Sequence, residues 1–336
     1  MAAFRTVSVG KNDVDKRLDR WFREYFPGTG FGELQKLLRT GQVRVDGKRA
    51  KASLRLEVGQ QVRVPPQAQS GIAVPAEERA KRARKAPPPV KETDAKALKN
   101  MILYRDETII VLNKPPGLAV QGGTKTFHHL DGMLDALTFD ADERPRLVHR
   151  LDRDTSGILV LARTRAAAQA LTKAFRARET RKIYLAVTAG VARPRQGQIN
   201  LALGKTGGRG QERMTGGAGD ARSAVTLYTV LDAAGQKAAL VSLMPLTGRT
   251  HQLRAHMAVI ETPIMGDGKY GGSQAFIGGL GLEKRLHLHA YRLEIPKPGG
   301  GLLSVEAPLP THMRTAVAAF GFDISTDLDP FPRETD

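Results

Sequence analysis

Residues 149–161 read HRLDRDTSGILVL, a highly charged stretch that runs directly into four apolar residues. The apolar run predicts a buried strand, and the residues before it predict the loop that leads into that strand. Charged side chains beside a core strand cost desolvation free energy unless they pair or carry out chemistry. A loop held by such a strand is also a rigid place for a reactive carboxylate. On residues alone, Asp152 and Asp154 fit a metal site, a general base, a nucleophile or a purely structural arginine network.

The sequence around this stretch, residues 101–336, predicts one large domain in which strands outnumber helices. Helical spacing is found at about 127–138, 165–177, 250–260 and 311–320. Strand patterns occur at 102–104, 109–112, 159–161, 184–187, 225–231, 240–244 and 286–295. Because the two kinds of element do not alternate regularly, we expect an α+β fold with a large mixed, mainly antiparallel sheet. Residues 204–219 contain seven glycines and are expected to be a mobile insertion.

The N-terminal part predicts a separate, small α+β domain over residues 1–64. Leu18, Trp21, Phe22 and Tyr25 have helical spacing, a second helical pattern begins at about residue 31, and Asp46-Gly47 marks a hairpin turn. Residues 65–100 are rich in Pro, Ala and charged side chains, with a basic run at 81–85. This composition predicts a flexible linker between the small domain and the large one.

The charge of the chain points to a polyanionic partner. Its 336 residues include 52 Lys and Arg against 34 Asp and Glu, and residues 1–100 carry +11 of the net +18. Basic side chains that neutralise phosphates release counterions, which gives sequence-independent affinity for nucleic acid. The candidate phosphate contacts are Lys36 and Arg39 on the second helix and Arg44 and Lys48 at the hairpin. The alternative interpretation is a solvated basic surface without a nucleic-acid partner.

Composition also excludes several classes. The chain has no Cys, which excludes disulfide scaffolds, thiol catalysis and Cys-ligated zinc. No run of about 18 apolar residues predicts a transmembrane helix, and the first residues lack a signal-peptide core. His251/His256 and His287/His289 lack the carboxylate partner of a zinc helix, so no metal site is expected. We expect a cytoplasmic monomer that does not bind membranes.

The stretch at 149–157 is similar, without a mismatch, to the hallmark segment of the RluA family of pseudouridine synthases, and three further blocks resemble that family in the expected order. These blocks are 112–120, 182–186 and 246–256, the last followed by 263–267 and 270–271. The first block looks most like the RluC branch, whose members modify large-subunit ribosomal RNA. Residues 17–47 resemble the RNA-binding module of the ribosomal protein S-four.

The resemblance implies a fold, an activity and roles for single residues. The expected fold is that of the pseudouridine synthases, and the activity is isomerisation of uridine to pseudouridine in RNA, above all 23S ribosomal RNA, without a cofactor or metal. Asp152 is implied to be the catalytic aspartate, Tyr184 to stack on the uracil, and Arg249 to pair with Asp152. Arg150 is implied to help open the RNA and to occupy the space of the flipped base. Attack at C1′ and attack at C6 both stay open.

Two alternatives differ from this interpretation. The first is a non-catalytic ribosomal RNA-binding or assembly factor on the same scaffold, but such a protein would be expected to have lost Asp152, Tyr184 or Arg249, and all three are present. The second is the same chemistry on transfer RNA. The basic N-terminal domain favours a large structured RNA over this second alternative.

Overall fold

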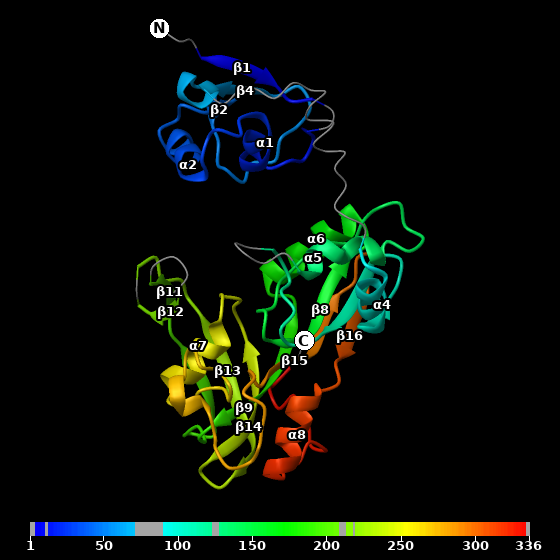
Figure 1. The fold of residues 1–336 in the computed structure, drawn as a ribbon, viewed down its shortest axis with the longest axis vertical. Coiled ribbons are helices and arrows are strands. Elements are labelled where there is room, and N and C mark those ends of the chain that lie inside the picture. Colours follow the sequence, from blue (N-terminus) through cyan, green and yellow to red (C-terminus); the bar gives the residue numbers. More distant parts are fainter. Residues whose placement is uncertain are drawn as a thin grey trace. The chain divides into compact units, whose positions relative to one another are not determined.

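The computed structural model describes residues 4–10, 13–70, 90–122, 128–207, 213–217 and 219–333. The chain divides into two compact units, Met1–Pro89 and Val90–Asp336, and each is described by itself (Figure 1). The basic run at 81–85, predicted to belong to a linker, lies outside the described residues.

The first unit packs two helices against a small antiparallel sheet. Its elements are α1 (Leu18–Tyr25), α2 (Phe31–Arg39), β1 (Arg5–Ser8), β2 (Arg44–Val45), β3 (Lys48–Arg49) and β4 (Gln61–Val64), with strand order β1-β4-β2-β3. The helices bury Trp21, Phe22 and Leu34 among others, and β4 adds Val62 and Val64 to the same core. The helical spacing at 18–25 and the turn at Asp46-Gly47 therefore form the elements that they predict, with both turn residues at positive φ.

The linker predicted over 65–100 is too long at both ends. Residues Pro66–Ser70 form a 3-10 turn (η2), and Glu92–Asn100 form helix α4 of the second unit. Glu92 and Asp94 in the first turn of α4 and Lys99 in the last turn complement the helix dipole. The helix is held by Leu98, which is fully buried in the large core. Since a single apolar side chain gives no visible periodicity, composition alone indicated a linker.

The second unit is built on a ten-stranded sheet. Its strands are β5 (Ile102–Arg105), β6 (Ile109–Lys114), β7 (Arg146–Leu147), β8 (Ser156–Ala162), β9 (Arg181–Ala189), β10 (Gln196–Asn200), β13 (Val225–Ala234), β14 (Ala238–Pro245), β15 (Leu288–Pro296) and β16 (Leu302–Glu306). The main order is β10-β13-β14-β9-β15-β8-β6-β5, with β16 on β15 and β7 on β8. Every described pairing in this sheet is antiparallel except β8 with β15. The predicted α+β class with a mixed, mainly antiparallel sheet is confirmed.

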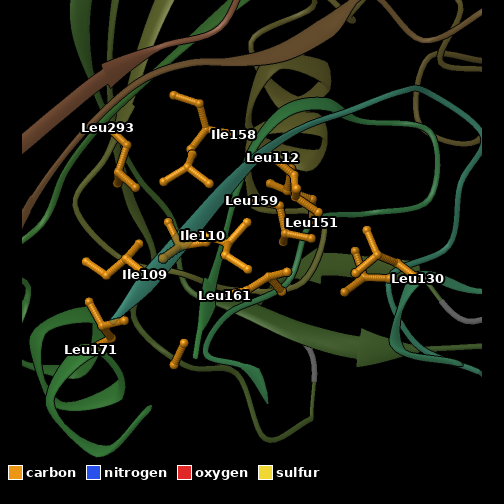
Figure 2. Close-up of a cluster of buried hydrophobic side chains, with 14 of the residues drawn as sticks. Ile109, Ile110, Leu112, Leu130, Leu151, Ile158, Leu159, Leu161, Leu171 and Leu293 are labelled. Carbon is orange, nitrogen blue, oxygen red and sulfur yellow. The ribbon is translucent and has the colours of Figure 1, made fainter. Parts of the chain in front are cut away.

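Helices pack on the sheet and bury its strands. They are α5 (Leu130–Met133), η3 (Leu134–Leu137), α6 (Arg165–Ala177), α7 (Gln252–Val259), η4 (Gly272–Ala275) and α8 (Thr311–Phe320). Figure 2 shows the cluster in which Leu171 of α6 and Leu130 of α5 join β6 and β8. All seven residues of β8 are buried, which is why the sequence after Ser156 is a continuous apolar run. Within the described ranges, the helices include none with the length and apolarity to cross a bilayer.

The glycine-rich stretch at 204–219 is not simply a mobile insertion. Much of it forms a two-stranded hairpin, β11 (Leu203–Thr206) with β12 (Arg213–Gly216), which extends beside α7 (Figure 1). Leu203 is buried with Ala224 and Ala255, which fixes the base of the hairpin. Gly216 packs closely on Leu201, because a Cβ there would lie 2.8 Å from a terminal methyl carbon of that side chain, which would have to move. Because the stretch at 204–219 is rich in glycine, its sequence did not indicate this packing.

Candidate active site

The charged loop that the sequence singled out leads from β7 into β8. Leu151 is buried in the core that Figure 2 shows, and its neighbour Asp152 is only partly exposed. Gly157 has φ +104°, and a Cβ there would lie 2.2 Å from the carbonyl oxygen of Ala290. Only glycine lets β8 approach β15 this closely. The backbone after Asp152 is therefore fixed by the sheet itself.

Lys114, at the end of β6, ties this loop to its neighbour. Its side chain is fully buried, and Nζ donates to the carbonyl oxygens of Pro115 at 2.9 Å, Leu118 at 3.0 Å and Arg153 at 2.9 Å. Burial lowers the pKa of Lys114 to about 7, opposed by the charges of Asp154 and Asp152. Three carbonyl acceptors match the three hydrogens of an ammonium group, so the lysine holds two loops in one arrangement.

Two histidines anchor the same segment from the other side. His289 Nε2 lies 3.0 Å from the Ala307 carbonyl, to which it must donate, so its Nδ1 accepts from the Ser156 hydroxyl at 2.9 Å. His149 Nε2 accepts from the Val160 amide at 2.8 Å while its ring stacks on Phe175. Burial lowers the pKa of His149 to about 3 and that of His289 to about 4. Both rings are therefore neutral parts of the scaffold at neutral pH.

Asp152 lies between two nitrogen donors, one near each carboxylate oxygen. His251 Nε2 is 3.8 Å from Oδ1, and a terminal guanidinium nitrogen of Arg254 is 3.8 Å from Oδ2. The Asp152 side chain is 18% exposed, which leaves one side of it open to a ligand. A guanidinium is always charged, so Arg254 presents a permanent positive charge to Asp152.

Arg254 is held by a second carboxylate. Its Nε and Nη2 donate to the two oxygens of Asp267, each at 2.7 Å, in a bidentate fork. This leaves the remaining nitrogen, Nη1, directed at Asp152. The arginine lies on the buried face of α7, so its position is determined by packing as well as by charge.

The expected pair between Asp152 and Arg249 is wrong. Arg249 Nε donates to the carbonyl oxygen of Ser223 at 3.0 Å, and the arginine beside Asp152 is Arg254. The reason is the turn before α7, where Gln252 accepts from the Arg249 amide and the Thr247 hydroxyl and donates to β13. This turn fixes Arg249 toward β13, although its side chain still lines the cavity.

Asp152 and the predicted Tyr184 open onto one cavity of about 510 Å³. Tyr184 is on β9, opposite Leu243 of β14 and Ala290 of β15, and is half-buried. Burial raises the pKa of its phenol, and the charge of Asp152 adds to that rise. The exposed Arg150 lines the same cavity. An ionised carboxylate next to an aromatic wall suits a flat ligand that carries an electrophilic carbon.

Comparison with known proteins identifies the family. The family model for RNA pseudouridylate synthase matches residues 108–259. The ribosomal large subunit pseudouridine synthase C of Salmonella typhi is 35% identical over 316 residues, which cover 92% of this chain and 94% of that protein. The protein of the same name from Escherichia coli (strain K12) is 36% identical over 311 residues, covering 91% and 93%. This chain belongs to the RNA pseudouridine synthase family.

A solved structure of a pseudouridine synthase supports the fold. Human RNA Pseudouridylate Synthase Domain Containing 4 superposes with a TM-score of 0.58 at 31% identity, covering 68% of this chain and 96% of that one. The expected resemblance to the RluA family, the pseudouridine synthase fold and the enzyme class are confirmed. The chain is an isomerase that converts uridine in RNA to pseudouridine.

Three residues of this synthase site, His251, Arg254 and Lys114, had no predicted functional role. A signal for the first two was present, because they lie three residues apart at the start of a predicted helix and would share one face. Lys114 ends an apolar strand, where an ammonium has to find acceptors. Of the predicted RNA contacts, Lys36, Arg39 and Lys48 are exposed, while Arg44 donates to the carbonyl oxygens of Gly41 and Gly47.

Proposed function

We propose that this synthase isomerises uridines of large-subunit ribosomal RNA and that Asp152 is its nucleophile. The proposal is carried by one observation, a partly exposed carboxylate with a nitrogen donor beside each oxygen, in a cavity with Tyr184 in its wall. The RNA class is supported by the relatives named ribosomal large subunit pseudouridine synthase C, which align over nearly their whole length.

The reaction exchanges one glycosidic bond for another. The N1–C1′ bond breaks and leaves its electron pair on the uracil, the base turns, and C5 bonds to C1′. C5 then releases its proton to solvent water and N1 takes up a proton from water, so the product is an isomer of the substrate. Asp152 acts in this sequence either by bonding transiently to C1′ or by adding to C6 and leaving again, and both routes need the ionised carboxylate. Nothing is oxidised or reduced, so side chains of this chain suffice for the steps.

Tyr184 supplies a stacking surface for the flipped base. A raised pKa means that its phenol keeps its proton at neutral pH, so the hydroxyl is a poor general base. The ring face instead offers the uracil a flat contact, and such base–aromatic stacking is worth about 1–3 kcal/mol per base. This stacking offsets part of the cost of taking the uridine out of its helix.

A basic rim around the cavity suits the RNA backbone. The cationic side chains that line it, besides Arg254, are Arg150, Arg176, Arg178, Lys182 and Arg249. Phosphates on either side of a flipped nucleotide would meet this rim, and Arg150 would fill the space that the base leaves. In the first unit, the exposed Lys36, Arg39 and Lys48 provide further phosphate contacts, with Arg44 shaping the hairpin beside them.

We further infer that the synthase works as a monomer in the cytoplasm, where bacterial ribosomes are assembled. The relatives named ribosomal large subunit pseudouridine synthase C support the ribosomal setting.

The test uses the full chain and a transcript of 23S ribosomal RNA, with pseudouridines mapped by carbodiimide reactivity. We expect new pseudouridines at defined positions with the wild type and none with D152N or D152A, while both variants bind the transcript with unchanged affinity. Full activity of either variant would refute the nucleophile assignment. Modification of transfer RNA alone would refute the ribosomal substrate.

A further inference from the structure

A short chain of polar groups connects the candidate nucleophile with the hairpin β11–β12. The backbone amide of Met214, on β12, donates to the hydroxyl oxygen of Tyr270 at 3.0 Å. The same hydroxyl is 2.9 Å from Nδ1 of His251, whose other nitrogen, Nε2, lies 3.8 Å from Asp152 Oδ1. Neither His251 nor Tyr270 has a role in the reaction as described so far.

The direction of these contacts follows from which groups can donate. An amide N–H only donates, so it occupies a lone pair of the Tyr270 oxygen and leaves the hydroxyl proton for His251 Nδ1. An ionised carboxylate only accepts, so Asp152 favours a proton on the facing Nε2. Every donor in the chain then points toward Asp152. Burial lowers the pKa of His251, which keeps the ring neutral with a single proton.

The backbone at His251 also indicates a fixed orientation. This residue has φ +52° at the N-terminus of α7, a left-handed conformation that is uncommon outside glycine. Its ring meets the Tyr270 ring edge to face at a centroid distance of 5.6 Å. The imidazole is therefore held by its backbone, by a neighbouring ring and by a hydrogen bond.

Both carboxylate oxygens need a donor if the carboxylate is to keep one orientation. Arg254 approaches Oδ2 and His251 approaches Oδ1, each at 3.8 Å. These separations are longer than a hydrogen bond, as is common before substrate binds and the site tightens. With one donor removed, the carboxylate can rotate away from the reacting carbon.

We propose that His251 is a positioning residue that orients Asp152 for attack and that Tyr270 connects it to β12. The hairpin contributes a second contact, because the Arg213 guanidinium lies 6.0 Å from the Tyr270 ring centroid. The Arg254 guanidinium lies 5.2 Å from the same centroid. Docking of β12 on Tyr270 thereby sets the geometry of the nucleophile. This inference rests on the proposed function, since it concerns the same aspartate.

Two substitutions of His251 separate its two nitrogens. H251N keeps a polar atom near the Nδ1 position but has nothing at Nε2, whereas H251Q places an amide donor near Nε2. The rate of the chemical step is measured under single turnover as tritium release from RNA labelled at uridine C5, and RNA affinity is measured by filter binding. We expect H251N to slow this step by about tenfold or more with affinity within about twofold, and H251Q to recover most of the rate.

Substitution of Tyr270 tests whether this residue connects His251 to β12. Y270F should slow the chemical step in the wild type but add little to H251N or H251Q, because residues in one network are not additive. H128N, the same kind of substitution at a 65% exposed histidine outside the cavity, serves as the control and should change nothing. If H251N does not fold, the wild type, Y270F, H251Q and the double variant Y270F/H251Q form a double-mutant cycle that still tests the connection.

The outcomes separate the inference from the proposed function. If the wild type releases tritium, three results would each overturn this inference and leave the proposed function intact. These results are a full rate for H251N, equal losses for H251N and H251Q, and an additive effect of Y270F. No release by the wild type would overturn the proposed function and this inference with it.

Discussion

Arg254 serves two carboxylates at once, and this double contact explains why an arginine is needed there. Two of its nitrogens are taken by Asp267 at 2.7 Å, and the third faces Asp152. A lysine has a point charge that cannot form the fork and reach the second carboxylate together. The Arg249 guanidinium, by contrast, donates to the Ser223 carbonyl and borders the cavity.

We therefore predict that R254K lowers kcat by about 100-fold, equivalent to about 2.7 kcal/mol, because a lysine cannot hold Asp267 and face Asp152 at the same time. R249K should lower activity by less than about tenfold and act mainly through KM, since its charge stays at the RNA-facing rim. Tritium-release kinetics with both variants provide the measurement. Equal losses, or a larger loss for R249K, would return the pairing role to Arg249.

Tyr184 makes a second prediction at this scale. Y184F keeps the flat ring, so the single-turnover rate should stay within about tenfold of the wild type if stacking is its main role. Y184L should lose about 1–3 kcal/mol of stacking free energy. This loss is measured as weaker binding of RNA in which the uridine is flipped out or lies opposite an abasic site. A loss of activity in Y184F as complete as in D152N would instead assign chemistry to the hydroxyl.

How much the sequence could predict depends on how local each feature is. Asp152 and Tyr184, which line the same cavity, could be predicted as candidates because each belongs to a short motif on or beside one strand. The choice between Arg249 and Arg254 depends on the exact start of α7, which Gln252 and the left-handed His251 fix through contacts with β13. The hairpin β11–β12 and helix α4 depend on partners distant in sequence, Ala255 and the large core respectively, which composition does not reveal.

At the scale of elements, the loop that carries Asp152 is fastened by buried polar groups on three sides. Lys114 fastens it to the turn after β6, His289 to β15 and β16, and His149 to α6. Each of these groups costs desolvation free energy, which their hydrogen bonds offset. The benefit is a carboxylate whose backbone does not move.

K114M tests this fastening. It leaves the carbonyl oxygens of Pro115, Leu118 and Arg153 without their donor, and each buried unpaired acceptor costs about 1–3 kcal/mol. Because the desolvation cost of the ammonium is removed as well, we expect a net loss of about 2–4 kcal/mol in the free energy of unfolding. Urea denaturation measures it, with K173M on the exposed face of α6 as the control. Unchanged stability would show that the loop is held without Lys114.

The buried histidines predict how stability depends on pH. Burial lowers the pKa of His149 to about 3 and those of His287 and His289 to about 4. Below about pH 6.5 these histidines bind protons in the unfolded chain but not in the folded chain. The free energy of unfolding should therefore fall as the pH drops from 6.5 toward 4. The slope is at most about 1.4 kcal/mol per pH unit for each histidine.

H149Q isolates one of these contributions, because its amide oxygen can still accept from the Val160 amide. Urea denaturation between pH 7 and pH 4.5 should show a shallower decline for H149Q than for the wild type. H128Q, at an exposed histidine, should follow the wild type. Parallel curves for all three proteins would contradict a His149 that stays neutral in the folded chain.

At the scale of the whole molecule, charge and chemistry are divided between two units. Residues 1–89 carry 19 basic and 9 acidic side chains, whereas all residues that line the cavity belong to 90–336. Among the described residues, each unit also has buried clusters of its own, one in the first and five in the second. This division suggests that affinity for RNA and isomerisation of uridine can be weakened separately.

The triple variant K36Q/R39Q/K48Q of the full chain tests that separation. The three side chains are exposed on α2 and β3, so neutralising them should leave the fold intact. Each lost phosphate contact lowers the slope of log K against log salt by about 0.7–0.9, so the slope should fall by about 2–3. The single-turnover rate at saturating RNA should stay within about twofold, because these charges affect the affinity for RNA and not the reacting atoms.

Deletion of residues 1–89 is the second test. The second unit retains its own core and should still fold, and the slope should be reduced at least as far as in the triple variant. An unchanged slope in either protein, measured by filter binding across salt concentrations, would mean that the first unit does not bind RNA through these charges.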